Sequence, residues 1–280
     1  MDAQPVFASG KGHRDENFPV ASFLLKPEHR APVMAFYRFA RAADDISDHE
    51  QLAADAKLDL LARMRAGLDG DPDGSAEAIA LRHVMIERAL DPVHAHDLLD
   101  AFVRDVTVNR YADWAGLIGY CRLSAMPVGR YVLDVHGEDR ACWPASDALC
   151  AALQVINHLQ DCGKDLRTLD RVYLPAETLA ETGAGIADIA ADRASPALRA
   201  AIVELVGKTR LLLDQSAGFA TMIVDRRLAA EVAIIHRLAV SLCDRLETRD
   251  PLSERVHHRS WEAALLAAGA AAGSLFRRAA

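Results

Sequence analysis

Hydrophobic residues recur along most of the chain with the three- and four-residue spacing of amphipathic α-helices. Runs of alternating β-branched residues, which would indicate strands, are missing. The clearest turn-rich break, Gly67 to Gly74, lies too early in the chain to divide two domains. The pattern therefore predicts one all-α domain over residues 1–280, with helices near residues 28–46, 51–67, 76–90, 93–109, 113–137, 197–224 and 226–247.

Prolines and glycines refine this prediction. Pro127 and Gly129 predict a kink in the helix over 113–137. A further long helix, ending near Asp165, is expected to be capped by Ser146 or Asp147. The remaining segments are predicted as a short extended link over 171–175, a loop from Gly183 to Pro196, and a last helix from about residue 253, after Pro251.

The helix ending near Asp165 carries a polar stripe although its other faces are apolar. The stripe consists of two amides and two carboxylates: Gln154, Asn157, Asp161 and Asp165. With about 100° of rotation per residue, all four fall within an arc of about 80° along about 16 Å of helix axis. Unpaired buried carboxylates cost several kcal/mol each, and a bound metal ion relieves that cost.

A second stripe of the same kind closes the first predicted helix. Arg41, Asp44 and Asp48 lie within about 60° of one another on a helical wheel. A solvated face would explain either Asp-x-x-x-Asp pair alone. Two such pairs on facing helices would hold hard cations through oxygen ligands, and those cations would bind a phosphate.

Phosphate bound in this way indicates a particular chemistry. A diphosphate held by Mg²⁺ becomes a good leaving group, and the carbocation that forms must be shielded from water by a closed apolar pocket. Aromatic faces also stabilise a cation. For each candidate lining residue a plain core role is the alternative; the candidates are Phe36, Tyr37, Phe39, Tyr120 and Tyr131.

Composition and charge exclude other classes. The net charge of −8, without a sustained basic block, argues against a nucleic-acid partner. Five cysteines without a C-x-x-C pair argue against disulfides or zinc and favour a reducing cytoplasm. No signal-peptide pattern or apolar run of about 20 residues is present, so a soluble or peripheral protein is expected. The chain also lacks a G-x-G-x-x-G motif for a nicotinamide, and neither aspartate motif carries the Glu-x-x-His pair of a di-iron centre.

Four motifs together resemble the trans-isoprenyl diphosphate synthases of the squalene and phytoene synthase group, over essentially the whole chain. The motifs are Arg41-x-x-Asp44-Asp-x-x-Asp48, Gly119-Tyr120-Cys-Arg, Gln154-x-x-Asn157-x-x-x-Asp161-x-x-x-Asp165 and Arg171-Val-Tyr-Leu-Pro175. The stretches from Gly12 to Ser22 and from Pro127 to Arg130 look most like the bacterial hydroxysqualene synthase branch of hopanoid pathways.

The resemblance implies an isoprenoid-synthase-type helical bundle around a central apolar cavity, with an Mg²⁺ cluster and no nicotinamide. The branch implies that presqualene diphosphate loses diphosphate, rearranges and captures water to give hydroxysqualene. Separate pathway enzymes would make the substrate and reduce the alcohol. The open alternatives are a synthase that condenses two farnesyl or geranylgeranyl diphosphates head to head, and a non-catalytic scaffold relative.

The resemblance also implies roles for individual residues. The expected metal ligands are Asp44, Asp48, Asn157, Asp161 and Asp165. The expected diphosphate contacts are Asn17, Ser22, Arg41, Gln154, Asn157 and Arg171. Tyr120 is expected to lie beside the reacting carbons, and the substrate pocket to include Phe36, Tyr37 and Met126.

The chain departs from the family pattern at three positions. Gln160 stands where many relatives have Arg, Lys164 where many have an acid, and Met126 where this branch often has a polar amide. The apolar tail from Trp261 to Arg278 has two interpretations, a final core helix or a weak membrane-surface helix with basic anchors. The second would place the protein at the inner face of the membrane.

Overall fold

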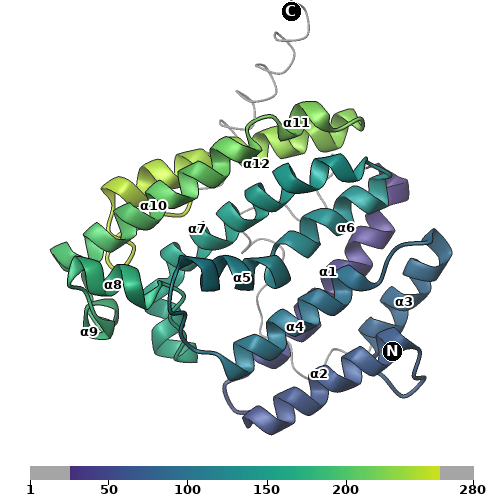
Figure 1. Cartoon of the computed structure of the whole chain (residues 1–280). Helices are drawn as coiled ribbons and strands as arrows, with labels where there is room; N and C mark the ends of the chain where they lie inside the picture. The colour runs from purple at the N-terminus through teal and green to yellow at the C-terminus, as the bar shows by residue number, and fades with distance from the viewer. Residues whose placement is uncertain (1–25, 259–280) are drawn as a thin grey trace, which may run out of the picture.

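The structure is a computed structural model that describes residues 26–258. Within this part of the chain the regular secondary structure is helical, which confirms the all-α prediction. One isolated β-bridge joins Arg110 and Val172. The longer helices are α1 (Pro27–Ser47), α2 (Ala54–Asp69), α3 (Ala76–Arg88), α4 (Val93–Thr107), α5 (Trp114–Ser124), α6 (Met126–His136), α7 (Trp143–Leu169), α10 (Pro196–Ser216) and α12 (Arg226–Thr248). The short ones are η1 (Arg140–Cys142), α8 (Ala176–Thr182), α9 (Ile186–Ala190) and α11 (Phe219–Met222) (Figure 1).

Helix α1 carries the first acidic motif in its last turns. It begins at Pro27, whose missing N–H costs nothing in the first helical turn. Phe36 and Phe39 are buried in the core cluster that α1 shares with α2, α3, α4 and Tyr131, which fixes the face that α1 turns inward. The helix stops where the backbone N–H of Asp48 bonds the carbonyl of Asp44, so both carboxylates lie at its C-terminal end.

Helix α7 lies at the centre of the molecule and packs against α6, α10 and α12 (Figure 1). Its contacts on several sides explain why its non-motif faces are apolar. The predicted cap at Ser146 or Asp147 is wrong, because Cys142 precedes the first turn and the helix starts earlier. Ser146 is buried within the helix, and the Asp147 carboxylate accepts hydrogen bonds of 2.8 and 2.5 Å from Arg130.

The predicted kinked helix is two helices, α5 and α6. Ala125 lies between them with φ −121° and ψ −45°, outside helical geometry. Pro127 has no N–H to continue the helix and instead occupies the first turn of α6. Gly129 then lets α6 approach α7, since a Cβ atom there would lie 2.5 Å from Ser146 Oγ and 2.6 Å from Cys150 Sγ.

Three other segments differ from the prediction. The helix expected over 197–224 is interrupted, because α10 ends at Ser216 and α11 begins at Phe219. Short helix α9 lies inside the loop expected from Gly183 to Pro196, and α8 lies between that loop and the expected link over 171–175, where no helix was predicted. Residues 253–258 are not helical, and the rest of the expected last helix lies outside the described residues.

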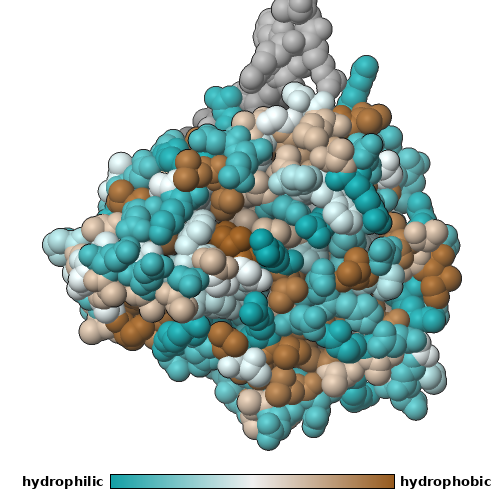
Figure 2. Space-filling view, in the orientation of Figure 1, coloured by the Kyte–Doolittle hydropathy of each residue, from teal (hydrophilic) through white to brown (hydrophobic). Residues whose placement is uncertain are grey.

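The hydrophobic core has two parts. One gathers side chains of α1 to α4, and the other centres on α7, α10 and α12. Helix α6 joins them, with Tyr131 in the first part and Leu133 in the second. The face in Figure 2 mixes polar side chains with scattered apolar ones. Among residues 26–258, every helix is too short or too polar to cross a bilayer.

Candidate active site

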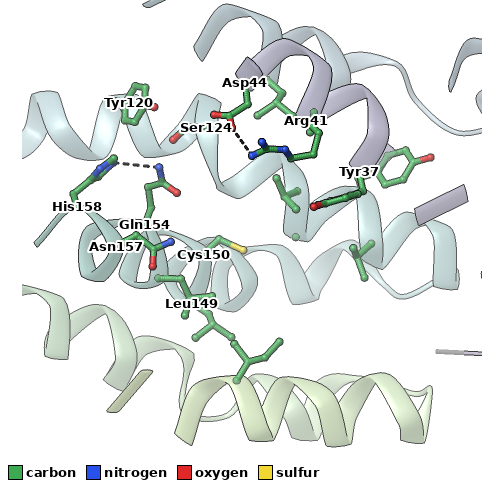
Figure 3. A pocket seen from close by; sticks show the side chains of 18 of the residues that line it. Tyr37, Arg41, Asp44, Tyr120, Ser124, Leu149, Cys150, Gln154, Asn157 and His158 are labelled. Carbon is green, nitrogen blue, oxygen red and sulfur yellow. Dashed lines mark hydrogen bonds and ion pairs between the residues drawn. The ribbon is translucent and has the colours of Figure 1, made fainter. Parts of the chain in front are cut away.

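A cavity of about 790 Å³ lies between the two parts of the core. Helices α1, α4, α5, α6, α7, α11 and α12 contribute to its wall. Because the C-terminal turns of α1 and the C-terminal half of α7 both line this cavity with aspartates, one end of it is acidic. In Figure 3, Arg41 and Asp44 of α1 lie across the cavity from Gln154 and Asn157 of α7.

Both aspartate pairs line this end of the cavity: Asp44 and Asp48 from α1, Asp161 and Asp165 from α7. Burial raises the pKa of Asp165 from 3.8 to about 7, and the carboxylates of Asp161 and Asp48 add to this shift. Asp165 therefore experiences the negative charge of both helices. A cation bound between the two aspartate pairs would relieve the repulsion among their carboxylates.

Arg41 is held by the acids that follow it in α1. Its Nη1 donates to Asp44 at 2.7 Å, the contact drawn in Figure 3, and its Nη2 donates to Asp45 at 2.6 Å. The guanidinium therefore lies against the first aspartate pair, within reach of any anion bound there.

The amides of α7 continue the polar stripe away from Asp161. Gln154 and Asn157 both line the cavity. The side-chain amide nitrogen of Gln154 lies 3.1 Å from Nε2 of His158 (Figure 3). Burial, followed by the charge of Arg171, lowers the pKa of His158 to about 3, so the imidazole is neutral at physiological pH.

An aromatic wall borders the acidic end. The ring of His158 stacks on Tyr173 with centroids 3.6 Å apart, and Tyr120 lies 5.4 Å from Tyr173 and 5.8 Å from His158. Both phenols donate hydrogen bonds of 2.8 Å to the buried carboxylate of Asp105. All four side chains line the cavity.

The guanidinium of Arg171 is held by hydrogen bonds from all three of its nitrogens to neighbouring protein groups. Its Nη1 donates to Asp48 at 2.6 Å, its Nη2 to the carbonyl of Ser47 at 3.0 Å and its Nε to the carbonyl of Asp105 at 2.9 Å. The side chain is buried. Its geometry is that of a residue that orients Asp48, although it also lines the cavity.

The other end of the cavity is apolar. Phe36 and Tyr37 of α1 line it, together with side chains of α6 and α12, as expected. Phe39 and Met126 do not line it and are buried in the core instead. Met126 follows the break between α5 and α6, which directs it into the cluster around α7.

The remaining expected residues are more dispersed. Asn17 and Ser22 lie outside the described residues. Lys164 lines the cavity next to the second aspartate pair, whereas Gln160 is buried beside it and lines a smaller cavity of about 220 Å³. His257, from the segment after α12, reaches the same region, with Nε2 3.8 Å from Asp161 Oδ1.

The donor set suits a hard divalent cation, since it consists of carboxylate and amide oxygens. Among residues 26–258, however, no three acidic, histidine or cysteine side chains converge on one point as a ready-made metal site. The two pairs face one cavity from separate helices. They fit a cation that completes its coordination with water and substrate phosphate, as Mg²⁺ does.

Several residues of the site escape sequence reasoning. Asp105 lies on a helix face that gives no sign of its two phenol partners, which are 15 and 68 residues away. Ser124 lines the cavity one turn after Tyr120, and its buried hydroxyl has no hydrogen-bond partner within residues 26–258. Tyr173 and His158 carried a signal, because they lie inside the Arg171 to Pro175 motif and the Gln154 to Asp165 motif.

Comparison with known proteins agrees with this arrangement. The family model for squalene/phytoene synthase matches residues 12–262. The hydroxysqualene synthase of Zymomonas mobilis is 54% identical over 273 residues, covering 97% of this chain and 92% of that protein. The hydroxysqualene synthase of Rhodopseudomonas palustris is 51% identical, covering 99% of this chain and 95% of that protein.

Solved structures share the fold. The squalene synthase HpnC from Alicyclobacillus acidocaldarius superimposes with a TM-score of 0.67 at 30% identity, over 81% of this chain and 88% of that one. A dehydrosqualene synthase crystallised with a ligand gives a TM-score of 0.76 at 20% identity, over 92% of this chain and 91% of that one, and supports the fold alone. With the family match and the relatives above, these findings show that the chain belongs to the squalene/phytoene synthase family of enzymes.

Proposed function

We propose that the protein is a hydroxysqualene synthase, which removes diphosphate from presqualene diphosphate, allows the carbocation to rearrange and captures it with water. In squalene and hopanoid biosynthesis this reaction follows the formation of presqualene diphosphate and precedes reduction of the alcohol. The observation that carries the proposal is a cavity with facing aspartate pairs at one end and an apolar wall at the other. Two relatives named hydroxysqualene synthase, identical at 54% and 51% of positions, support the choice of reaction.

The acidic end supports diphosphate chemistry. We assign the metal-binding role to Asp44, Asp48, Asn157, Asp161 and Asp165, all of which line the cavity. Bound Mg²⁺ supplies charge neutralisation to the departing diphosphate.

Arg41 and Arg171 add positive charge to this end in different ways. Arg41 borders the first aspartate pair and is placed to contact a bound anion. Arg171 holds the carboxylate of Asp48 in position and also lines the cavity where the diphosphate would bind. Pre-positioned charges of this kind stabilise charge that develops as the C–O bond breaks.

The rest of the cavity supports a carbocation. Its volume of about 790 Å³ lies toward the upper end of the 300–1,000 Å³ typical of small-molecule pockets, which suits a long hydrocarbon. Phe36, Tyr37 and Tyr120 present aromatic surface that stabilises a nearby cation.

Water capture requires a polar group in the cavity wall. With Met126 buried in the core, Ser124 is a candidate, because the residue lines the cavity and its buried hydroxyl has no hydrogen-bond partner within the described part of the chain. A water molecule held there would lose one proton as its oxygen bonds to the carbocation, and the departed diphosphate is a base able to accept that proton.

The alternative is head-to-head condensation of farnesyl or geranylgeranyl diphosphate, which needs the same diphosphate site. One experiment separates the two. The purified chain is incubated with Mg²⁺ in H₂¹⁸O, without nicotinamide, with presqualene diphosphate or farnesyl diphosphate in separate reactions. Products are identified by mass spectrometry, with the double variant Asp44→Asn plus Asp161→Asn as the inactive control.

The proposed function requires a C30 alcohol carrying ¹⁸O from presqualene diphosphate and no product from farnesyl diphosphate alone. Consumption of farnesyl diphosphate to a C30 product would identify a condensing synthase instead. An alcohol without ¹⁸O would mean that the P–O bond was cleaved and that no carbocation was captured. Turnover of neither substrate would contradict the proposal and favour a different prenyl length or a scaffold role.

A further inference from the structure

The carboxylate of Asp105 lines the cavity without belonging to either aspartate pair. It lies on α4, buried, and lines the cavity near the acidic end. Its Oδ2 accepts a hydrogen bond from the hydroxyl of Tyr120 and its Oδ1 accepts one from the hydroxyl of Tyr173, both at 2.8 Å. Each carboxylate oxygen therefore holds one phenol, and each phenol uses its only proton on Asp105.

This arrangement fixes how Tyr120 meets the cavity. A phenol that donates to a carboxylate cannot donate into the cavity, so it has only its ring and its oxygen lone pairs to offer a bound substrate. Hydrogen bonding to an anion also increases the negative charge on the phenol oxygen. Both effects favour a positive charge beside the ring.

The backbone carbonyl of Asp105 connects the two phenols and their carboxylate to the acidic end of the cavity, through Arg171. Nε of Arg171 donates to the Asp105 carbonyl at 2.9 Å, while Nη1 of the same guanidinium donates to Asp48 at 2.6 Å. Burial raises the pKa of Asp105 from 3.8 to about 6, while the charge of Arg171 and the two phenols oppose the shift. The carboxylate thus remains mainly ionised at neutral pH.

We infer that Asp105 is a positioning residue for the carbocation: through Tyr120 it makes the cavity wall beside the departing diphosphate electron-rich. The inference deepens the proposed function and rests on it for the identity of the cation. Asp105 itself acts behind the phenol and is not assigned a contact with substrate.

Asp105→Asn tests the inference with little change in volume. The amide has one acceptor oxygen and two donor hydrogens, so both phenols can no longer donate to separate carboxylate oxygens. Tyr111→Phe is the matched control, since Tyr111 stacks behind Tyr173 at 5.7 Å, does not line the cavity, and its hydroxyl has no partner within the described residues.

The readout is the affinity for two isosteric probes, with Mg²⁺ and inorganic pyrophosphate present. One probe is a prenyl tertiary amine, protonated at pH 7, and the other is its uncharged hydrocarbon counterpart. Asp105→Asn should weaken binding of the cationic probe about 10-fold or more and change that of the neutral probe less than about twofold. With presqualene diphosphate as substrate, kcat should fall about 100-fold with little change in KM, whereas Tyr111→Phe should match the wild type.

A double-variant comparison tests whether the effect passes through Tyr120. In the Tyr120→Phe background, Asp105→Asn should cause little further loss of cation selectivity, because the two changes remove the same interaction. Equal weakening of both probes, or fully additive losses, would overturn the inference. If Asp105→Asn does not fold, wild-type cation selectivity in Tyr120→Phe alone would overturn it. Selective binding of the cationic probe without turnover of presqualene diphosphate would refute the proposed function but not the role of Asp105.

Discussion

The guanidinium of Arg171 donates a 2.6 Å hydrogen bond to the carboxylate of Asp48, which lies 123 residues earlier in the chain. The contact ties the C-terminal end of α1 to the segment that follows α7, and so fixes the distance between the two acidic motifs. The exposed fraction of the Arg171 side chain is 7% and that of Asp48 is 21%, so the pair is largely shielded from solvent. An interaction between these residues therefore matters both for stability and for the geometry of the site.

Arg171→Lys should lower the free energy of unfolding by about 3 kcal/mol, because one ammonium cannot reproduce three directed hydrogen bonds and leaves buried acceptors unsatisfied. Urea denaturation measures this change. Arg110→Lys is the control, since Arg110 pairs with the exposed Asp170 and such surface pairs contribute less than about 1 kcal/mol. Equal stability of the two variants would contradict the role given to Arg171.

The raised pKa of Asp165 predicts a pH dependence. Because its pKa rises from 3.8 in the unfolded chain to about 7 in the fold, ionising Asp165 destabilises the metal-free protein progressively as the pH increases from about 4 to 7. Asp165→Asn removes this penalty. The metal-free variant should melt about 2–4 °C above the wild type at pH 8, and the difference should disappear near pH 4.

Mg²⁺ binding should instead become stronger as the pH increases, since Mg²⁺ binds the ionised carboxylate of Asp165. Mg²⁺ with pyrophosphate should raise the melting temperature of the wild type more at pH 8 than at pH 6, and Asp165→Asn should lose most of that increase. Asp170→Asn, an exposed change just after α7, should retain it. A pH-independent increase in the wild type would argue against Asp165 as a ligand.

Gly129→Ala should destabilise the protein by about 1–3 kcal/mol, because its Cβ would lie 2.5 Å from Ser146 Oγ and would force α6 away from α7. Gly119→Ala provides the contrast within α5, where a Cβ meets nothing within 4 Å. That change should be neutral or stabilise by up to about 1 kcal/mol through helix propensity. Thermal and urea unfolding measure the stability of the two variants. If Gly129→Ala is as stable as the wild type, α6 and α7 are less closely packed than described.

Glu138→Gln should loosen the start of α12. The buried carboxylate of Glu138 accepts the backbone N–H groups of Val224 and Asp225, both at 2.8 Å, and an amide can accept only through its one oxygen. We expect a loss of about 1–2 kcal/mol and faster hydrogen exchange at these two amides. Glu204→Gln, at a partly exposed pair with Lys208, should leave both amides unchanged. Unaltered exchange in Glu138→Gln would refute the contact.

The sequence by itself determined the helices and the faces they present. Helix formation depends on hydrogen bonds and side-chain spacing within a few residues, so periodicity located α1 to α4 to within a few residues and placed both aspartate pairs on single faces. The irregularity near Pro127 was also visible, because a missing N–H is a local property. Whether that irregularity was a kink or the complete break at Ala125 depended on how α6 packs against α7.

The tertiary structure decided which partner each polar side chain has. Arg171 looked like a phosphate ligand in the sequence, and three of its N–H groups donate to Asp48 and to carbonyls that only the fold brings near. Met126 turned into the core because the break at Ala125 reset the direction of α6. Asp105 gained its two phenols from segments distant in sequence. Spacing along one helix determines which side chains share a face, but a hydrogen bond between helices depends on packing that no local pattern encodes.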